Sequence, residues 1–259
     1  MKDSDDEADT ETNDESEDFD FSGVKVETFF TVAFLFELGL VLVAALVGYM
    51  TSGTPFPFEL KLTDYQWVLR GFGYGVLATL PPAIFAFFAT SSIGLRLGAM
   101  RRMYDRVKSL IGTSLVQLSA WEILLLAASA GVGEEILFRG VLQPTLGIVT
   151  TSVLFGMLHW LSTTYFVLAS LMGFYCGWLF GVTGDNLLAP ITVHWLYDAV
   201  ALFLFQHRVR RDRERNEATP TGPESLRGGD SATIDTEEDA DAGLSPPPNQ
   251  DREGDSDEG

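Results

Sequence analysis

The ionisable residues that could do chemistry in this chain are few, and they lie inside apolar segments. Residues 130–140 read AGVGEEILFRG and contain Glu134, Glu135 and Arg139. On a helix, Glu135 and Arg139 lie on one face and can form an ion pair, whereas Glu134 points about 100° away. This pattern fits a reactive Glu134 held in place by a Glu135–Arg139 pair, and it fits equally well a structural ion-pair cluster at a helix end.

Two of the three histidines also occur in apolar segments. The stretch FGMLHW places His159 four residues after Phe155, and VHWLYDAV places His194 and Asp198 four residues apart on one helical face. A lone histidine on an apolar helix is often a hydrogen-bonded packing residue, and a His–Asp pair can join two helices. The same pair also suits a metal-ligand pair, or a histidine that is oriented by its acid.

Taken together, Glu134, His159, His194 and Asp198 form a set of donors on three separate apolar segments. A carboxylate and two histidines could bind zinc with one coordination position left open. Without a metal, the glutamate could activate water while the histidines polarise a carbonyl group and stabilise the oxyanion. Charges at membrane depth cost about 2.5–3.5 kcal/mol each on insertion scales, so they usually face a bundle interior or a water-filled cavity.

The elements that must position these residues are apolar segments long enough to cross a bilayer. Six such spans are expected, at about 28–50, 71–92, from Ile111 towards the two glutamates, 146–161, 163–182 and 187–206. Pro81 and Pro82 predict a kink in the second span. Glu37 and Glu122 have no comparable partners, so we interpret them as single polar groups that face the bundle or lie near the interface. A soluble bundle is disfavoured, because its helices would be apolar on all sides.

Charge is distributed very unevenly along the 259 residues. The formal net charge is −19, and 26 of the 36 carboxylates lie in residues 1–20 and 207–259. These tails have few large apolar residues to offset the entropy of ordering, which predicts disorder. Four lysines against thirteen arginines, with abundant carboxylate, are typical of a high-salt cytoplasm, so we interpret the protein as halophilic. The single cysteine, Cys176, excludes an intrachain disulfide.

Basic residues predict the orientation in the membrane. They gather between the second and third spans and again after the sixth span, as Arg96, Arg101, Arg102, Arg106 and Lys108, and as Arg208, Arg210, Arg211, Arg213 and Arg215. Because positive residues mark the cytoplasmic side, six spans would leave both tails in the cytoplasm. The sequence therefore predicts an all-α, polytopic integral membrane helical bundle of about six transmembrane helices with disordered acidic tails, located in the plasma membrane.

Three stretches match known motifs in order. EEILFR at 134–139, FGMLH at 155–159 and HWLYD at 194–198 correspond to EExxxR, FxxxH and HxxxN/D. With them the chain resembles the CPBP family of intramembrane proteases, which includes the CAAX prenyl endopeptidases and bacteriocin-immunity proteins. The resemblance covers about residues 110–205. It divides the chain into an acidic tail (1–24), two spans with a basic loop (25–110), a CPBP-like intramembrane protease domain (111–206) and a second acidic tail (207–259).

The resemblance implies roles for the catalytic residues. Glu134 would activate the attacking water with His159 as its partner, and Glu135 and Arg139 would shape the pocket. The predicted function is an intramembrane endopeptidase that hydrolyses a peptide bond near the cytoplasmic membrane face. Its expected partners are the lipid bilayer and a peptide or protein substrate, with CAAX-type processing of a prenylated protein as the substrate that the family suggests. No nucleic-acid partner is expected, and the sequence predicts no oligomeric state.

The resemblance also bears on a metal. His194 and Asp198 would complete the site as metal ligands or as oxyanion support. The third motif often ends in asparagine, and the aspartate found here favours a divalent metal, zinc, bound by Glu134, His159, His194 and Asp198.

Two alternative functions stay open. A non-catalytic membrane protein could bind a partner or confer immunity to a peptide toxin. A proton-coupled transporter could use Glu134, His159 and His194 as a relay, although no inverted repeat is visible.

Overall fold

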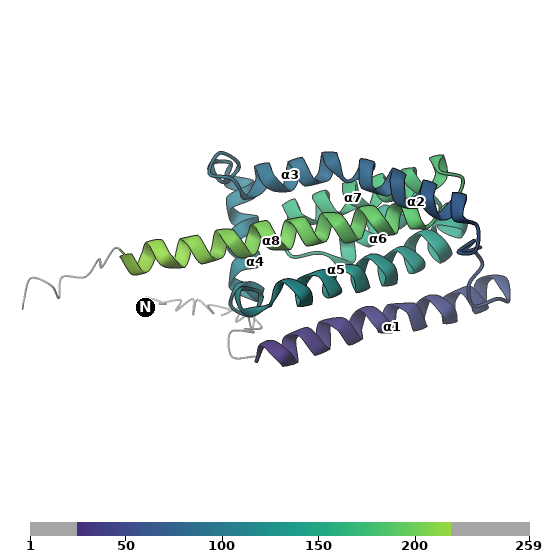
Figure 1. Cartoon of the computed structure of the whole chain (residues 1–259), viewed down its shortest axis with the longest axis horizontal. Coiled ribbons are helices and arrows are strands. Elements are labelled where there is room, and N and C mark those ends of the chain that lie inside the picture. Colours follow the sequence, from purple (N-terminus) through teal and green to yellow (C-terminus); the bar gives the residue numbers. More distant parts are fainter. Residues whose placement is uncertain (1–24, 219–259) are drawn as a thin grey trace, which may run out of the picture. The chain divides into compact units, whose positions relative to one another are not determined.

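The computed structural model describes residues 25–218, which fold into helices with no strand among them (Figure 1). The α-helices are α1 (Val26–Ser52), α2 (Tyr65–Ala78), α3 (Leu80–Thr90), α4 (Gly98–Gln117), α5 (Ala120–Glu135), α6 (Gln143–Leu158), α7 (Thr163–Val182) and α8 (Leu188–Ala218). A 3-10 turn, η1 (Gly94–Arg96), precedes α4, and a π-helix, η2 (Ile136–Leu142), joins α5 to α6. The predicted all-α class is confirmed. The tail 1–24 and residues 219–259 lie outside the described chain.

Five segments of the described chain are long and apolar enough to cross a membrane, as expected for a multi-pass membrane protein. They are Val26–Ser52, Tyr65–Thr90, Ala120–Leu158, Thr163–Val182 and Leu188–Ala218. The third and fourth predicted spans both overlap the single 39-residue segment Ala120–Leu158. A straight helix of that length would measure about 58 Å, nearly twice the hydrocarbon thickness. Gly147 interrupts it with a left-handed φ of 76°, and the remainder of α6 packs against α7.

The third span begins later than predicted. Ile111 belongs to α4, and α5 starts only at Ala120. The break is stabilised by a capping box, in which the Ser119 hydroxyl accepts from the Glu122 backbone N–H and the Glu122 carboxylate accepts from the Ser119 N–H at 2.8 Å. Glu122 therefore caps α5 and has no contact with the other buried acids. The second span bends as predicted, because Thr79 separates α2 from α3, whose first turn contains proline.

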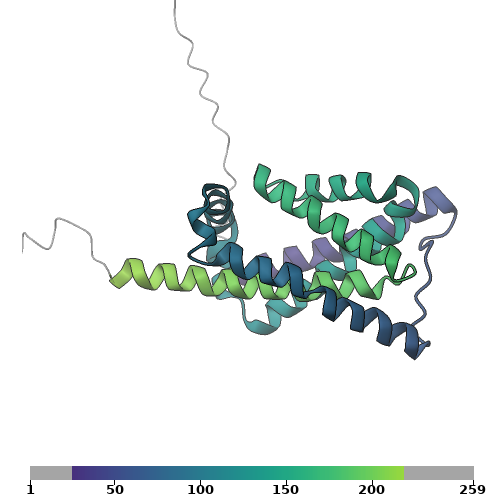
Figure 2. The same cartoon turned by 90° about the horizontal axis from the view of Figure 1, so that it is seen from above.

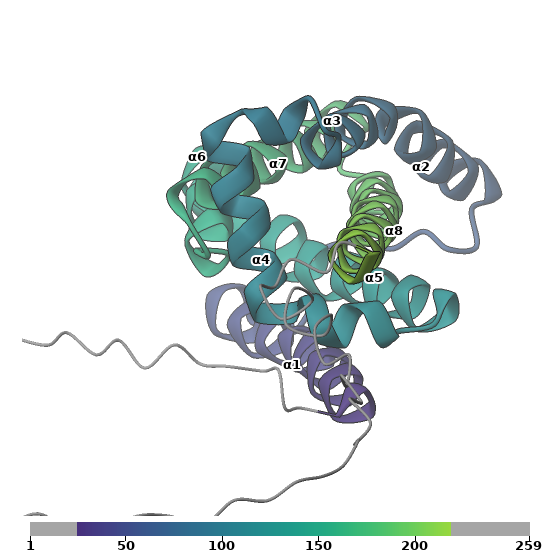
Figure 3. The same ribbon diagram turned by 90° about the vertical axis from the view of Figure 1, so that its left-hand side faces the viewer.

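Helix α4 runs across one end of the bundle rather than along it (Figures 1 and 3). It carries the basic cluster predicted between the second and third spans and is not among the membrane-spanning candidates of the described chain. The loop 53–64 between α1 and α2 lies at the opposite end (Figures 1 and 2). The basic residues of α4 therefore lie at one end of the bundle, as expected for a helix at the membrane surface.

Helix α8 is the centre of the bundle and packs against α2, α3, α4, α5 and α7. Gln206 of α8 donates from its amide nitrogen to the carbonyl oxygens of Leu115 and Leu118, at 2.8 and 2.9 Å. Further along α8, Asp212 accepts a hydrogen bond from the Tyr104 hydroxyl at 2.9 Å. Burial, together with this carboxylate, raises the pKa of Tyr104. These contacts hold residues 207–218 in a helix, whereas we predicted that the disordered tail begins at 207.

Candidate active site

Glu134 and Glu135 end α5 at the point where it passes into the π-helix η2. Such π segments occur frequently at functional sites, because the extra residue per turn redirects side chains. Both carboxylates are buried, with 6% and 0% of their surface exposed. Two glycines allow neighbouring helices to pack closely here. A Cβ added at Gly131 would lie 3.0 Å from the backbone of α8, and one added at Gly133 would lie 2.6 Å from the backbone of α1. The absence of a side chain at both positions therefore allows α1 and α8 to pack directly against the end of α5.

The predicted Glu135–Arg139 ion pair is present. Arg139 Nε lies 3.0 Å from Glu135 Oε2, and neither side chain is exposed. The guanidinium carbon also lies 5.3 Å from the centroid of the Phe155 ring. A buried charge is tolerated only when it is paired, so each group permits the burial of the other. The second oxygen of Glu135 accepts a hydrogen bond from His194 Nδ1 at 2.9 Å, which makes the pair a support for that histidine.

The Glu134 carboxylate lies between two imidazole rings. Its Oε1 is 3.6 Å from His159 Nε2, and its Oε2 is 3.7 Å from His194 Nε2. The same nitrogen of His194 is 3.4 Å from Asp198 Oδ2. The structure thus brings together the six residues predicted from the three motifs, from the end of α5, from η2, from the residue after α6 and from α8.

Hydrogen bonds at Nδ1 orient both imidazole rings. His159 Nδ1 donates to the Phe155 carbonyl oxygen at 2.8 Å, and His194 Nδ1 donates to Glu135. With Nδ1 engaged as a donor, each Nε2 faces Glu134. A neutral ring in this orientation presents a lone pair that can accept a proton or bind a metal, and a protonated ring presents an N–H that can stabilise an anion.

A cavity of about 260 Å³ adjoins these rings, lined mainly by residues of α3, α4, α7 and α8. His159, His194 and Asp198 line it, and most of its other lining side chains are apolar. It extends along α8 to Phe205, about 10 Å further from Asp198 by helical rise, and to Tyr104 of α4. The site therefore connects through an apolar passage towards the end of the bundle that carries the basic cluster.

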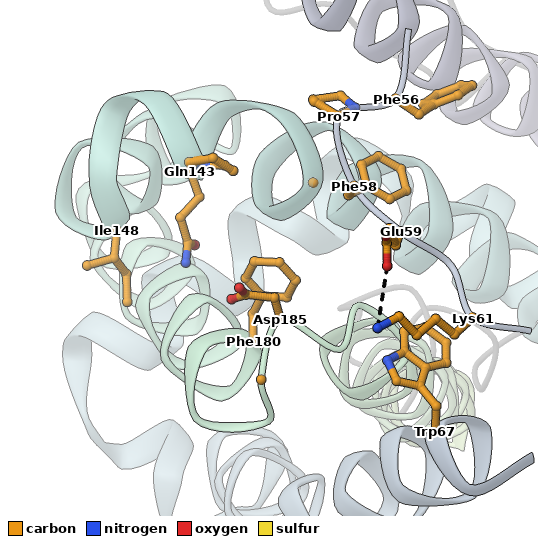
Figure 4. Close-up of a pocket in the computed structure, with 13 residues that line it drawn as sticks. Phe56, Pro57, Phe58, Glu59, Lys61, Trp67, Gln143, Ile148, Phe180 and Asp185 are labelled. Atoms are coloured by element: carbon orange, nitrogen blue, oxygen red, sulfur yellow. Dashed lines mark ion pairs between the residues drawn. The ribbon is translucent and has the colours of Figure 1, made fainter. Parts of the chain in front are cut away.

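A larger cavity, of about 810 Å³, lies at the other end of the bundle (Figure 4). The loop after α1 contributes Phe56, Phe58, Glu59 and Lys61 to its wall, and the last two form an ion pair of 3.4 Å. Among the described residues that line it there is no histidine and none of the six motif residues. The smaller cavity is therefore the candidate active site, because His159, His194 and Asp198 line it and no motif residue lines the larger one.

One residue of the site was missed by sequence reasoning. Glu37 of α1 has a buried Oε2 with no hydrogen-bond partner, and this atom would lie 3.5 Å from a Cβ added at Gly133. Glu37 interacts electrostatically with Glu134, Asp198 and both site histidines. The contact joins segments far apart in the chain, so no local pattern links them. Its only sequence signal was an acidic residue in the middle of an apolar span.

The candidate ligands are of the chemical types that bind zinc, but their side chains do not point at one common position. No three acid, imidazole or thiol groups among residues 25–218 are arranged to hold a metal ion as they lie. Three pairs of donor atoms are nevertheless close: Glu134 lies 3.6 Å from His159 and 3.7 Å from His194, and His194 lies 3.4 Å from Asp198. Two ligands of a tetrahedral zinc ion, bound at about 2.0–2.1 Å, lie roughly 3.3 Å apart. Rotation of these side chains would be required to bind zinc, and the metal stays a prediction.

Comparison with known proteins shows that the segment containing this site resembles a family of membrane endopeptidases. Residues 114–200, which contain all three motifs, match the family described as type II CAAX prenyl endopeptidase Rce1-like. The resemblance to CAAX-type intramembrane proteases that the motifs predicted is thereby confirmed for this segment.

A curated relative is known from a bacterium. The uncharacterized protein YpbD of Bacillus subtilis (strain 168) is 36% identical over 115 residues, which cover 40% of this chain and 58% of that protein. The chain therefore aligns with little more than half of the relative's length. No solved structure matches the chain.

Proposed function

We propose that this protein is an intramembrane endopeptidase in which Glu134 activates water for hydrolysis of a peptide bond. The observation that carries the proposal is the buried Glu134 carboxylate between two imidazole Nε2 atoms, at 3.6 and 3.7 Å, beside an apolar cavity. A carboxylate so placed can act as a general base, because its partners hold it within reach of a water in the cavity. The match of residues 114–200 to an endopeptidase family supports the same reaction.

In the proposed reaction, Glu134 accepts a proton from water while the water oxygen bonds to the scissile carbonyl carbon. His159 Nε2 orients this water together with Glu134. Negative charge that develops on the carbonyl oxygen is stabilised by the protonated Nε2 of His194, which faces the same space. When the tetrahedral intermediate collapses, the C–N bond breaks and Glu134 returns its proton to the leaving nitrogen. The products are a carboxylate and an amine.

The remaining motif residues position His194. Glu135 holds its Nδ1 at 2.9 Å, and Arg139 neutralises Glu135 in turn. Asp198, at 3.4 Å from Nε2, favours the protonated ring. Loss of any of the three is therefore expected to lower activity through the orientation or charge of His194 rather than through contact with the substrate.

We also propose zinc as a cofactor, bound by Glu134, His159, His194 and Asp198. Charge balance supports a cation, because the carboxylates of Glu134, Glu135 and Asp198 meet beside one guanidinium, that of Arg139, when the imidazole rings are neutral. A divalent ion would take the place of the proton on His194 Nε2, whose lone pair would then bind it, and it would polarise the scissile carbonyl group and acidify water. The proton transfers assigned to Glu134 do not depend on it.

The proposed substrate is the C-terminal region of a prenylated protein. The cavity offers an apolar wall that includes Phe85, Leu202 and Phe205, which suits a lipid-modified chain. It extends towards the basic end of the bundle, which would face the cytoplasm. This orientation would place both tails in the cytoplasm and would let a cytoplasmic peptide reach Glu134 along the cavity. The protein would act in the plasma membrane.

The hydrolysis is tested with the full chain in liposomes and a synthetic peptide whose farnesylated cysteine lies three residues before its C-terminus. Release of the tripeptide is measured by mass spectrometry. Glu134→Gln should lower the rate by about 10²–10⁴-fold, the usual contribution of a general base, and His159→Ala should also reduce it strongly. Glu122→Gln is the matched control, since it makes the same change on the same helix outside the site. Full activity of the Glu134 and His159 variants would refute the proposal.

The metal is tested separately by elemental analysis of the purified protein. Stoichiometric zinc that is lost in His194→Ala, and retained in Glu122→Gln, would support the metal site. Activity in protein without bound metal would overturn the metal and leave a glutamate–histidine hydrolase. If no peptide is cleaved but protection against a peptide toxin survives Glu134→Gln, the protein is a binding or immunity protein. Proton flux abolished by Glu134→Gln would instead indicate a transporter.

A further inference from the structure

Glu37 is a half-buried acid of the site, with a buried Oε2, to which the proposed mechanism assigns no role. It lies in the middle of α1, a 27-residue apolar helix whose other acid, Glu27, is in the first turn. An ionisable group at such depth is unfavourable by about 2.5–3.5 kcal/mol on insertion scales. The burial of its Oε2 without a hydrogen-bond partner adds to this cost. A residue that destabilises the fold in this way is retained most readily when it contributes to function.

Helix α1 packs on α5 so that Glu37 lies beside Gly133, the residue before Glu134. The backbone carbonyl of Glu37 occupies the space that a side chain at Gly133 would need, and its carboxyl lies over the same glycine. Gly133 directly precedes Glu134 in the chain, and Glu37 interacts electrostatically with the Glu134 carboxylate. Glu134 Oε2 is also buried without a hydrogen-bond partner. The two carboxyl groups therefore each have one buried oxygen that can accept a hydrogen bond.

We propose that Glu37 is a water-positioning residue of the hydrolytic reaction. A water molecule has two hydrogens to donate, and Glu37 and Glu134 would each accept one of them. The protonated Nε2 of His159 would donate to one lone pair of the water oxygen, which leaves the other lone pair directed at the scissile carbonyl carbon. Glu134 takes the proton that it accepts as the O–C bond forms, and returns it to the leaving nitrogen. Glu37 keeps its hydrogen bond to the new hydroxyl group and is chemically unchanged.

This inference rests on the proposed hydrolysis, and it goes beyond the similarity to known proteases. Helix α1 lies outside residues 114–200, the segment that matches the endopeptidase family. The role of Glu37 follows instead from the contact of α1 with α5 and η2. It also predicts that α1 is required for the chemical step and does more than anchor the protein in the membrane.

The test compares Glu37→Leu with Glu27→Leu, the same change at an exposed acid of the same helix. Both full-length variants are assayed in liposomes with the farnesylated peptide. Glu37→Leu should lower kcat roughly 10–100-fold with KM within about twofold of wild type, because a water-positioning group acts after the substrate binds. Its unfolding midpoint should stay unchanged or rise, since an unpaired buried acid is removed. A role confined to packing would lower the midpoint instead.

Glu37→Asp gives a second test that preserves the charge. It shortens the side chain by one methylene group, so kcat should fall while KM and the unfolding midpoint stay at wild-type values. If both Glu37 variants keep kcat within twofold of wild type while Glu134→Gln is inactive, the inference on Glu37 is wrong and the proposed function stands. If Glu134→Gln is itself fully active, the proposed function fails, and the inference fails with it.

Discussion

Replacement of Arg139 by methionine is expected to destabilise the protein strongly, because it leaves a buried charge without its partner. Arg139 and Glu135 have no exposed side-chain surface, and their ion pair measures 3.0 Å. After the change, Glu135 keeps only the hydrogen bond from His194 Nδ1. Breaking a buried ion pair on one side typically costs about 3–5 kcal/mol, or roughly two to four orders of magnitude in the unfolding equilibrium.

The double variant Glu135→Leu/Arg139→Met removes both charges and should recover most of the lost stability, since apolar side chains of similar volume fill the same space. It should not recover activity, because His194 loses the acceptor that orients its ring. Thermal unfolding of the full chain in detergent micelles, followed by tryptophan fluorescence, measures both effects. The single change should lower the midpoint by roughly 6–20 °C, at about 2–4 °C per kcal/mol.

Arg139→Lys serves as the control that keeps the positive charge, and its midpoint should lie between those of wild type and Arg139→Met. A loss of less than about 1 kcal/mol in Arg139→Met would refute the reasoning. Strict additivity would refute it as well: the double variant would then be less stable than either single variant, and the two side chains would act independently.

Three further changes test the packing that positions the site. Gly133→Ala places a Cβ 2.6 Å from the Glu37 backbone oxygen and should cost about 1–3 kcal/mol of stability and lower peptide cleavage. Gln206→Leu removes two buried hydrogen bonds to the carbonyl groups of Leu115 and Leu118 at the end of α4, with an expected loss of about 1–3 kcal/mol in chemical unfolding. Tyr104→Phe removes a phenol whose pKa is raised by burial and by Asp212. Because the pKa of Tyr104 is higher in the folded protein, the phenol contributes its full stability below pH 10, the approximate pKa in the unfolded chain, and this contribution falls as pH rises further. Above pH 10, Tyr104→Phe should therefore lose less stability than the wild type.

Matched controls exist for each of these changes. Gly39→Ala on α1 meets no atom within 4 Å and should leave cleavage unchanged; equal losses at both glycines would contradict the helix contact. Gln117→Leu removes an exposed hydrogen bond from the Gln117 side-chain amide to the Thr113 carbonyl oxygen within α4. A loss of stability as large as that of Gln206→Leu would contradict the role of burial. If Tyr104→Phe and wild type lose stability in parallel from pH 9 to 11, the Asp212 contact is not the cause.

Local patterns were sufficient to predict a large part of this protein. Continuous apolar segments predicted the membrane-spanning helices, because a span is defined by its length and composition. The four-residue spacing of Glu135 and Arg139 predicted their ion pair, since residues four apart share a helical face. The three motifs predicted the resemblance to CAAX-type intramembrane proteases, which residues 114–200 show. Each of these inferences depends on residues within about one or two turns of each other.

Helix ends and reversals were predicted less well. The apolar run after Ile111 concealed the break at Ser119, which depends on a capping box of only four residues. The interruption at Gly147, by contrast, coincides with the predicted start of the fourth span at about residue 146. The helix through residues 207–218 depends on contacts with α4 that no pattern within the acidic tail reveals. In both mispredicted cases, the composition of the segment suggested a different helix boundary from the one that capping and tertiary contacts set.

What the sequence determined by itself is the set of reactive groups, the helices that carry them and the kind of chemistry that they suit. Only the tertiary structure decided that Glu134 lies between two imidazoles, that both rings are held at Nδ1, and that Glu37 of α1 joins them. The physical reason is the range of the interactions. Helix propensity, hydropathy and i,i+4 pairing act within a few residues, whereas the site is assembled where α1, α5, α6 and α8 pack together.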